Sequence, residues 1–132
     1  MSNPIFNDKG FLIDHIESVM KFYHPHCINN NTGGFFQYFR DDGSIYDFDS
    51  KHLVSSTRFI FNYSMAAIQF DNKDYLDAAL HGIDYLRDSH LNKNTGGYAW
   101  TMKGAEVNDS TNYCYGLAFV LLAYSRAYKA GI

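Results

Sequence analysis

The sequence predicts an all-α fold with short β-hairpins, built from two like units within a single domain of 132 residues. Four stretches space their apolar residues at helical intervals. Two of them, residues 52–70 and the last 20 or so residues, are apolar on every side, which is typical of buried helices. The tetrapeptide Asn-Thr-Gly-Gly at 31–34 recurs at 94–97, so the chain contains an internal repeat with a period of roughly 60 residues.

The first unit is expected to contain a helix, a hairpin and a second helix. Asn7 or Asp8 can cap a helix that runs to about Tyr23 and has apolar residues on one face only. An aromatic cluster, a turn of Asp-Asp-Gly and a second apolar pair then predict a short hairpin within 35–46. The apolar helix follows, from about His52 to Phe70.

The second unit repeats this order. Asn72 can cap an amphipathic helix over about 73–89. A hairpin over 98–107 follows, with its turn at Lys103-Gly104. The final apolar helix is predicted from about residue 109 or 110 to residue 130, after an Asp-Ser pair like the one at 49–50.

The two repeats, about 8–71 and about 72–132, each pair an amphipathic helix with an apolar one. This alternation predicts an outer and an inner layer, as in a toroid of stacked helical hairpins. Two hairpins do not close a ring. We therefore expect the chain to be the N-terminal portion of a longer toroid, with self-association through the unclosed edges as the alternative.

Composition excludes several classes of function. The formal net charge is −3 and the chain has no block of Lys and Arg, so nucleic-acid binding is not expected. No apolar run reaches the roughly 18 residues of a membrane span, and the N-terminus lacks the features of a signal peptide. Cys27 and Cys114 form no CxxC motif and are expected to be free thiols. A cytoplasmic protein is the resulting prediction.

Arg58 is the one charged residue inside the apolar stretch 52–70. A guanidinium remains protonated, so its burial requires an anion, carbonyl groups or a polar cavity. We expect Arg58 to extend from a buried helix into a polar pocket. The alternative is an ion pair with a carboxylate between helices.

Other polar residues give weaker signals. None of the six histidines has a histidine partner at i+3 or i+4, so no helical metal site is predicted. His52, at the start of the apolar helix, is the only histidine expected near the pocket. Aspartates at 41, 42, 47 and 49 suggest a glycosidase pair, but turn and cap roles explain most of them better. The Gly-Gly loops lack the Lys-Ser/Thr of a phosphate-binding loop.

The segment KHLVSSTRFIFNYSMAA, residues 51–67, resembles the Lys-x6-Arg-x2-aromatic segment of the N-acylglucosamine 2-epimerase superfamily. Cellobiose 2-epimerases, mannose isomerases and sulfoquinovose isomerases belong to this superfamily. The surrounding order agrees, with a GGF hairpin, YLDAALHGIDYL, a GGY hairpin and YGLAFVLLAYSRAYKAG. The resemblance spans about residues 10–132 and corresponds to the first third of a family member.

The resemblance implies both a fold and a reaction. Family members form an (α/α)6 barrel with inner and outer rings of helices. They convert aldoses into their 2-epimers or into ketoses by proton transfer at C2, through an enediolate-like intermediate. Histidines act as general base and acid, because their pKa lies near the working pH, and no metal or redox cofactor is expected. The partner would be a monosaccharide or disaccharide.

Two residues carry the resemblance into a site. Arg58 matches the inner-helix arginine of the family's sugar pocket, where it would stabilise negative charge at O1 and O2. Tyr115 matches a tyrosine that points into the same cavity, although core packing is the plain alternative. The family often has Trp at the position of Val54 and His at that of Leu117, so a smaller and less aromatic pocket wall is expected.

His52 and Trp100 are additional candidates, Trp100 because an aromatic face on a hairpin can stack on a sugar ring. The catalytic histidines of the family lie on later helices, beyond residue 132, so no catalytic residue is expected in this chain. Two alternatives to a sugar epimerase or isomerase stay open. One is a catalytically silent carbohydrate-binding or interaction module, and the other is a different (α/α)6 enzyme such as a glycoside hydrolase or lyase.

Overall fold

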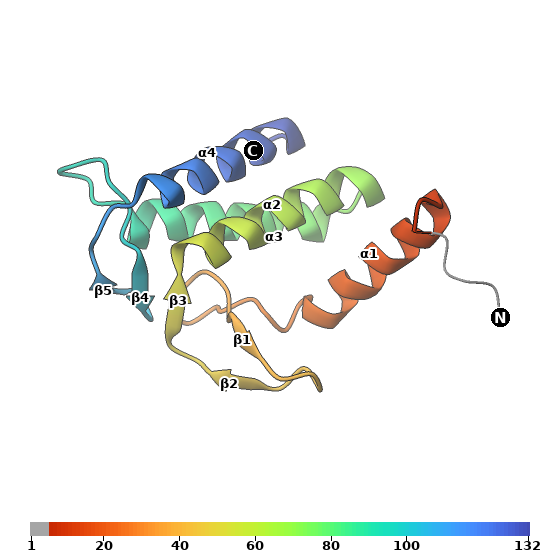
Figure 1. Cartoon of the computed structure of the whole chain (residues 1–132), viewed down its shortest axis with the longest axis horizontal. Helices are drawn as coiled ribbons and strands as arrows, with labels where there is room; N and C mark the ends of the chain where they lie inside the picture. Colours follow the sequence, from red (N-terminus) through yellow and green to blue (C-terminus); the bar gives the residue numbers. More distant parts are fainter. Residues whose placement is uncertain (1–5) are drawn as a thin grey trace.

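The computed structural model describes residues 6–132 and shows four α-helices with short strands gathered at one end (Figure 1). The elements in chain order are α1 (Lys9–Tyr23), β1 (Tyr38–Phe39), β2 (Ile45–Asp47), β3 (Ser50–His52), α2 (Leu53–Phe70), α3 (Lys73–Tyr85), the π-helical turn η1 (Leu86–His90), β4 (Thr101–Lys103), β5 (Glu106–Asp109) and α4 (Cys114–Ala130). The predicted class, helical with short hairpins, is confirmed. No helix among residues 6–132 is long and apolar enough to cross a membrane.

Helix α1 begins as predicted at Asp8, whose carboxylate accepts a hydrogen bond from the Phe11 backbone N–H at 2.8 Å. It diverges from the other helices in Figure 1 and buries only Met20 along its length. Its last turn anchors it, because the Tyr23 ring packs edge-on against Phe39 and Phe59. The rest of its apolar stripe is exposed: Phe11, Leu12, Ile16, Val19 and Phe22.

Helices α2, α3 and α4 form the packed part of the molecule, with α2 in contact with both α3 and α4. A Cβ atom at Gly82 in α3 would lie 2.5 Å from Ile60 and 2.6 Å from Phe35. A side chain larger than hydrogen would therefore force α3 away from α2. Leu53, Ile60 and Tyr63 of α2 are almost fully buried in this core.

The prediction that both apolar helices are buried on every side is wrong for the residues described. In α2, Arg58, Asn62, Ile68 and Gln69 are exposed, because α3 and α4 cover only part of its circumference. In α4 one narrow stripe is buried, Gly116, Val120, Ala123 and Ala127, while Leu121 and Tyr128 are 72% and 81% exposed.

Both predicted hairpins are present. Strands β1 and β2 pair antiparallel, with Tyr38 opposite Asp47, and β4 pairs with β5. The sequence did not reveal β3, which pairs with β4 and extends the second hairpin to a three-stranded sheet in the order β3-β4-β5. Lys51 therefore lies in a strand, and His52 is the N-cap of α2 rather than its first residue.

The final helix begins later than predicted, at Cys114. Asp109 is the last residue of β5, where it pairs with Thr101. Its carboxylate accepts a hydrogen bond from the Thr111 backbone N–H at 2.9 Å, which favours a turn over a helical start. The helix predicted over 73–89 is confirmed, with its last residues in the π-helical turn.

Candidate functional site

The four residues singled out from the sequence, His52, Arg58, Trp100 and Tyr115, line one pocket of about 340 Å³. The pocket lies where the hairpins meet the N-terminal ends of α2 and α4. We call it the hairpin pocket, and its lining is Gln37, Tyr38, His52, Val54, Ser55, Arg58, Trp100 and Tyr115. Val54 stands in its wall, as the sequence comparison with the superfamily implied.

Arg58 lies on the exposed side of α2 and lines the hairpin pocket. Its guanidinium carbon is 5.2 Å from the centre of the Phe119 ring, a cation–π geometry that restrains the side chain. No carboxylate in residues 6–132 forms a salt bridge with it. Within the described residues there is therefore no interhelical ion pair to occupy the positive charge.

Tyr115 is 60% exposed, so the described residues 6–132 do not bury it in their core. Its ring packs against Phe119 at 5.0 Å between centroids. Because the two residues are four apart on α4, they share a face of the helix. Phe119 thus contacts both Arg58 and Tyr115 and fixes their spacing. Phe119 was not predicted as a site residue, although its position four residues after Tyr115 is visible in the sequence.

His52 caps α2 through its side chain, because Nδ1 accepts a hydrogen bond from the Val54 backbone N–H at 3.1 Å. This contact assigns the proton of the neutral ring to Nε2. Burial lowers the pKa of His52 below its ordinary value. His52 is accordingly a neutral hydrogen-bond donor toward the pocket, and its basic nitrogen is already occupied.

Trp100 is held in place by its neighbours. Its ring centroid is 4.3 Å from that of His52 and 4.6 Å from that of Tyr113. On the α4 side, Gly116 leaves room for the indole, since a Cβ there would lie 3.2 Å from it. These contacts fix a flat aromatic surface beside Arg58.

Tyr38, a hairpin aromatic like Trp100, also lines the hairpin pocket, as do Gln37 and Ser55, which were not predicted. Gln37 is the one polar residue in the run Phe-Phe-Gln-Tyr-Phe, which was a usable signal. Its amide Oε1 accepts from the His52 backbone N–H at 2.7 Å, and its Nε2 donates to Ser56 Oγ at 2.9 Å.

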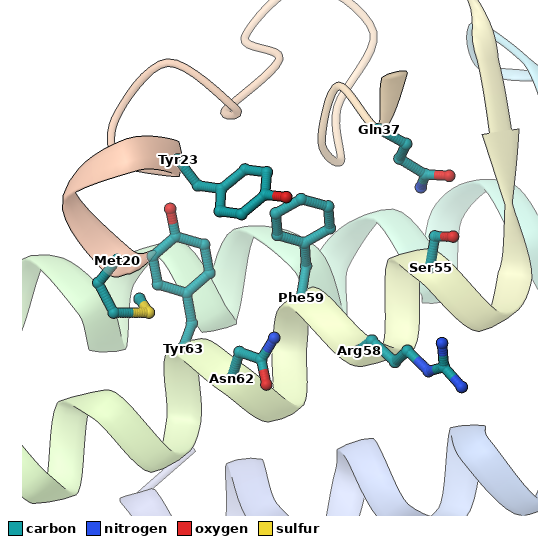
Figure 2. Close-up of a pocket in the computed structure, with 8 residues that line it drawn as sticks. All are labelled: Met20, Tyr23, Gln37, Ser55, Arg58, Phe59, Asn62 and Tyr63. Carbon is teal, nitrogen blue, oxygen red and sulfur yellow. The ribbon is translucent and has the colours of Figure 1, made fainter. Parts of the chain in front are cut away.

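A second cavity of about 230 Å³ adjoins the hairpin pocket and shares Gln37, Ser55 and Arg58 with it. Figure 2 shows these three residues at one end of the cavity, and Met20 and Tyr63 at the other. Aromatic side chains form much of its wall, together with Asn62. The two hollows therefore form a continuous depression along the exposed side of α2.

Acidic residues take no part in the pocket. The Asp42 carboxylate accepts from the Ser44 backbone N–H at 2.9 Å, and that of Asp47 accepts from Ser50 at 2.8 Å. Both are therefore turn residues, as predicted. Within 6–132, no group of three His, Cys, Asp or Glu side chains is placed to hold a metal ion.

The sequence model of the N-acylglucosamine 2-epimerase (GlcNAc 2-epimerase) family matches residues 34–132, three quarters of the chain. The chain belongs to the N-acylglucosamine 2-epimerase family. The resemblance drawn from residues 51–67 and their surroundings is thereby confirmed.

Named relatives within this family place the chain near sugar isomerases and epimerases. It is 54% identical over all its 132 residues to a D-mannose isomerase of Marinomonas mediterranea, covering 33% of that protein. It is 28% identical over 115 residues to a cellobiose 2-epimerase of Eubacterium cellulosolvens, covering 86% of this chain and 28% of that one. The chain thus spans about a third of the curated relatives that it matches.

Solved structures of the family agree with the fold. A crystal structure of a D-mannose isomerase superposes with a TM-score of 0.94 and 53% identity, over 99% of this chain and 33% of that one. The cellobiose 2-epimerase of Bacillus thermoamylovorans superposes with a TM-score of 0.81 over 92% of this chain and 33% of that one. At 16% identity the second match supports the fold alone.

Lys51 opens the family-like segment, yet it does not line the hairpin pocket. It is 1% exposed, and its Nζ donates to Thr32 Oγ1 at 2.9 Å and to the Gly33 carbonyl. Burial lowers the pKa of Lys51 to about 8. Its role in this chain is to tie the first Gly-Gly loop to β3.

Proposed function

We propose that this chain is part of a sugar 2-epimerase or aldose–ketose isomerase that transfers a proton at C2 through an enediolate-like intermediate. One observation carries the proposal. His52, Arg58, Trp100 and Tyr115 converge on one pocket, in a chain 54% identical to a D-mannose isomerase. D-Mannose is accordingly the first substrate to test.

The corresponding architecture is an (α/α)6 barrel in which residues 1–132 form one unit of two helical-hairpin repeats. The exposed apolar residues of α1 and α4 support this architecture, because further helices would cover them. In such a barrel the hairpin pocket opens toward the centre of one rim. Further helices supply the general base and acid.

The pocket residues suit the first half of this reaction. When a base removes the C2 proton of the open-chain sugar, negative charge develops on O1. The Arg58 guanidinium, which has no carboxylate partner in residues 6–132, stabilises that charge. Tyr115 hydrogen-bonds a hydroxyl, and Trp100 packs on the sugar face. Return of the proton to the opposite face of C2 gives the epimer, and its delivery to C1, with transfer of the O2 hydroxyl proton to O1, gives the ketose.

A catalytically silent carbohydrate-binding module is the second candidate, and one observation favours it. Of the histidines in residues 6–132, only His52 lines the hairpin pocket. Its Nδ1 is occupied by the Val54 N–H, so it does not serve as a base. A glycoside hydrolase is less well supported, because no carboxylate lines the pocket and that chemistry requires two.

Hydrogen exchange at C2 tests whether residues 1–132 transfer a proton without further helices. The purified chain is incubated in D₂O with D-mannose, D-glucose, cellobiose or N-acetylglucosamine, and deuterium at C2 is followed by NMR. Incorporation by the chain alone would overturn the silent module, and glycosidic cleavage would support the hydrolase. Binding without incorporation is expected both of a silent module and of one part of an isomerase, and these two are distinguished by the activity of a complete enzyme that contains this chain.

The role of Arg58 can be tested in a complete enzyme. This chain replaces the matching third of the Marinomonas mediterranea D-mannose isomerase, to which it aligns over its whole length. We expect the chimera to isomerise D-mannose and Arg58→Ala to lower kcat/KM more than about tenfold, the scale of a lost charged contact to the transition state. Arg126→Ala, an arginine of α4 outside the hairpin pocket, is the control. Unchanged kinetics in Arg58→Ala would remove this residue from the mechanism.

A further inference from the structure

A chain of hydrogen bonds beneath the hairpin pocket joins the two hairpins through α2. Gln37 bonds to the His52 backbone N–H and to Ser56 Oγ. Ser56 Oγ lies 3.4 Å from His90 Nε2, and His90 Nδ1 lies 2.8 Å from the Ala99 carbonyl oxygen. Ser56 and His90 are each 1% exposed. This series of hydrogen bonds thus connects the first hairpin to Ala99, the residue before Trp100.

Each bond in this chain has a defined direction. Because the Ala99 oxygen is only an acceptor, His90 Nδ1 donates to it. Burial lowers the pKa of His90 to about 4, so at neutral pH the ring is uncharged and Nε2 is an acceptor. Ser56 then donates its hydroxyl proton to Nε2 and accepts from Gln37 Nε2. At the other end, Gln37 Oε1 accepts from the His52 N–H.

These directions fix the orientation of the Gln37 amide, and one of the two N–H groups on its nitrogen has no partner among residues 6–132. A carboxamide nitrogen carries two N–H groups, and Ser56 is its only hydrogen-bond partner among residues 6–132. Gln37 also lines both the hairpin pocket and the adjoining cavity, beside Arg58 and Ser55 (Figure 2). A ligand in either hollow therefore meets an oriented amide with a free N–H.

The internal repeat supports a ligand-facing role for this position. Gln37 follows the first Gly-Gly pair by three residues, and Trp100 follows the second by three. Both side chains line the hairpin pocket. The two loops thus deliver a hydrogen-bonding and a stacking residue to the same hollow from equivalent positions.

We propose that Gln37 is a sugar-binding residue whose amide, held by His52 and Ser56, donates its second N–H to a hydroxyl group of the sugar. The proposal rests on the proposed function of the pocket and names a contact that the sequence did not indicate. It requires a specific hydroxyl on the ligand. A purely structural glutamine would be indifferent to which hydroxyls the ligand carries.

The test measures how the loss of the Gln37 amide and the loss of each sugar hydroxyl, alone and together, change the binding affinity. The ¹⁵N-labelled full chain and its Gln37→Met variant are titrated by NMR with D-mannose and with its 2-, 3-, 4- and 6-deoxy analogues. Methionine keeps the length of the side chain without hydrogen-bonding capacity. We expect Gln37→Met to weaken D-mannose binding about five- to tenfold, the scale of one hydrogen bond. Removing one particular hydroxyl should weaken binding to the wild type by a similar factor and leave binding to Gln37→Met unchanged.

Gln69→Met is the matched control, because Gln69 is the other glutamine of the chain and is exposed near the end of α2. Should Gln37→Met fail to fold by circular dichroism, Gln37→Glu replaces it, since the carboxylate still accepts from His52 but has no N–H to give. Equal losses for every deoxy analogue in wild type and variant would overturn the contact and leave the proposed function standing. Absence of sugar binding both by the wild-type chain and by the D-mannose isomerase chimera that contains it would overturn both.

Discussion

The two Asn-Thr-Gly-Gly loops share a pattern of closing hydrogen bonds and differ in their surroundings. In the first, the Asn29 side chain accepts hydrogen bonds from the N–H groups of Asn31 and Thr32. In the second, Asn92 does the same for Asn94 and Thr95. A backbone hydrogen bond closes each loop. The N–H of Asn29 donates to the carbonyl oxygen of Gly34, and the N–H of Asn92 donates to that of Gly97. The turn is therefore specified locally, by the asparagine and the glycines themselves.

The surroundings differ because of residues far away in the sequence. Asn29 is 2% exposed, whereas Asn92 lies at the surface. Lys51 and the Tyr85 ring enclose the first loop, and the Lys51 ammonium lies 4.5 Å from the ring centre. Sixty residues after Lys51, at the equivalent place behind the Asp-Ser pair, stands Thr111, which has no ammonium to donate. One loop is thus a buried anchor and the other a solvated turn.

Two sources of stability can be told apart in these loops, local hydrogen bonds and burial, although the repeated sequence suggests that the loops are alike. Local hydrogen bonds are common to both loops, so they contribute similarly. Burial against Tyr85 and Lys51 is specific to the first. The same substitution at matching positions of the two loops should therefore lower the free energy of unfolding by different amounts, and the difference is the contribution of burial.

The largest difference is expected at the glycines. Gly33 has φ +86° and a Cβ there would lie 3.0 Å from the Tyr85 ring, while its counterpart Gly96 has φ +77° and open space around it. Gly96→Ala should cost about 1 kcal/mol through backbone strain. Gly33→Ala should cost about 3 kcal/mol, because overpacking adds to the same strain. Urea unfolding of the two variants measures the difference, and equal losses would mean that Tyr85 moves aside freely.

Sequence patterns predicted most of the helices and both turns, because capping residues and apolar spacing act over a few neighbours. The cap at Asp8 was found in this way. Strand β3 was missed because three residues carry no periodicity and their partner β4 lies about 50 residues further along. Gln37 was visible as the one polar residue of an aromatic run, but its hydrogen-bond partners His52 and Ser56 are far away in the sequence and are brought to it only by folding.

Which sides of α2 and α4 are covered was also beyond the sequence. An apolar pattern shows that a surface favours burial, but it does not say which neighbour provides it. Arg58 is the clearest case, because it lies on a side of α2 that α3 and α4 leave uncovered, and the apolar pattern of the helix does not show which side that is.

Lys51 should give the first loop a dependence on pH that the second lacks. Its pKa is about 8 in the folded chain and ordinarily 10.5, so between these values the unfolded chain binds more protons. Stability attributable to this residue therefore rises as pH increases through that interval. Relative to Lys51→Met, the wild type should gain on the order of 1–2 kcal/mol between about pH 7 and about pH 9.5.

Comparing the two proteins at each pH removes the contribution of the buried tyrosines, Tyr63 and Tyr85, whose pKa values burial raises. Lys103→Met, in the adjacent strand β4 and exposed, is the control. It should follow the wild-type profile. A wild-type curve parallel to that of Lys51→Met would show that the ammonium titrates as it does in water.

The smallest difference is expected at the asparagines that close the loops. Asn29→Ala removes the oxygen that accepts hydrogen bonds from two backbone N–H groups. Because the loop is buried, water does not replace this oxygen as the acceptor. A loss of about 1–2 kcal/mol is expected for it. Asn92→Ala exposes the same two donors to solvent, so about 0.5 kcal/mol is expected. Urea unfolding at neutral pH measures both. If Asn92→Ala cost as much as Asn29→Ala, the local turn would dominate the stability of both loops, and burial of the first by Tyr85 and Lys51 would contribute little.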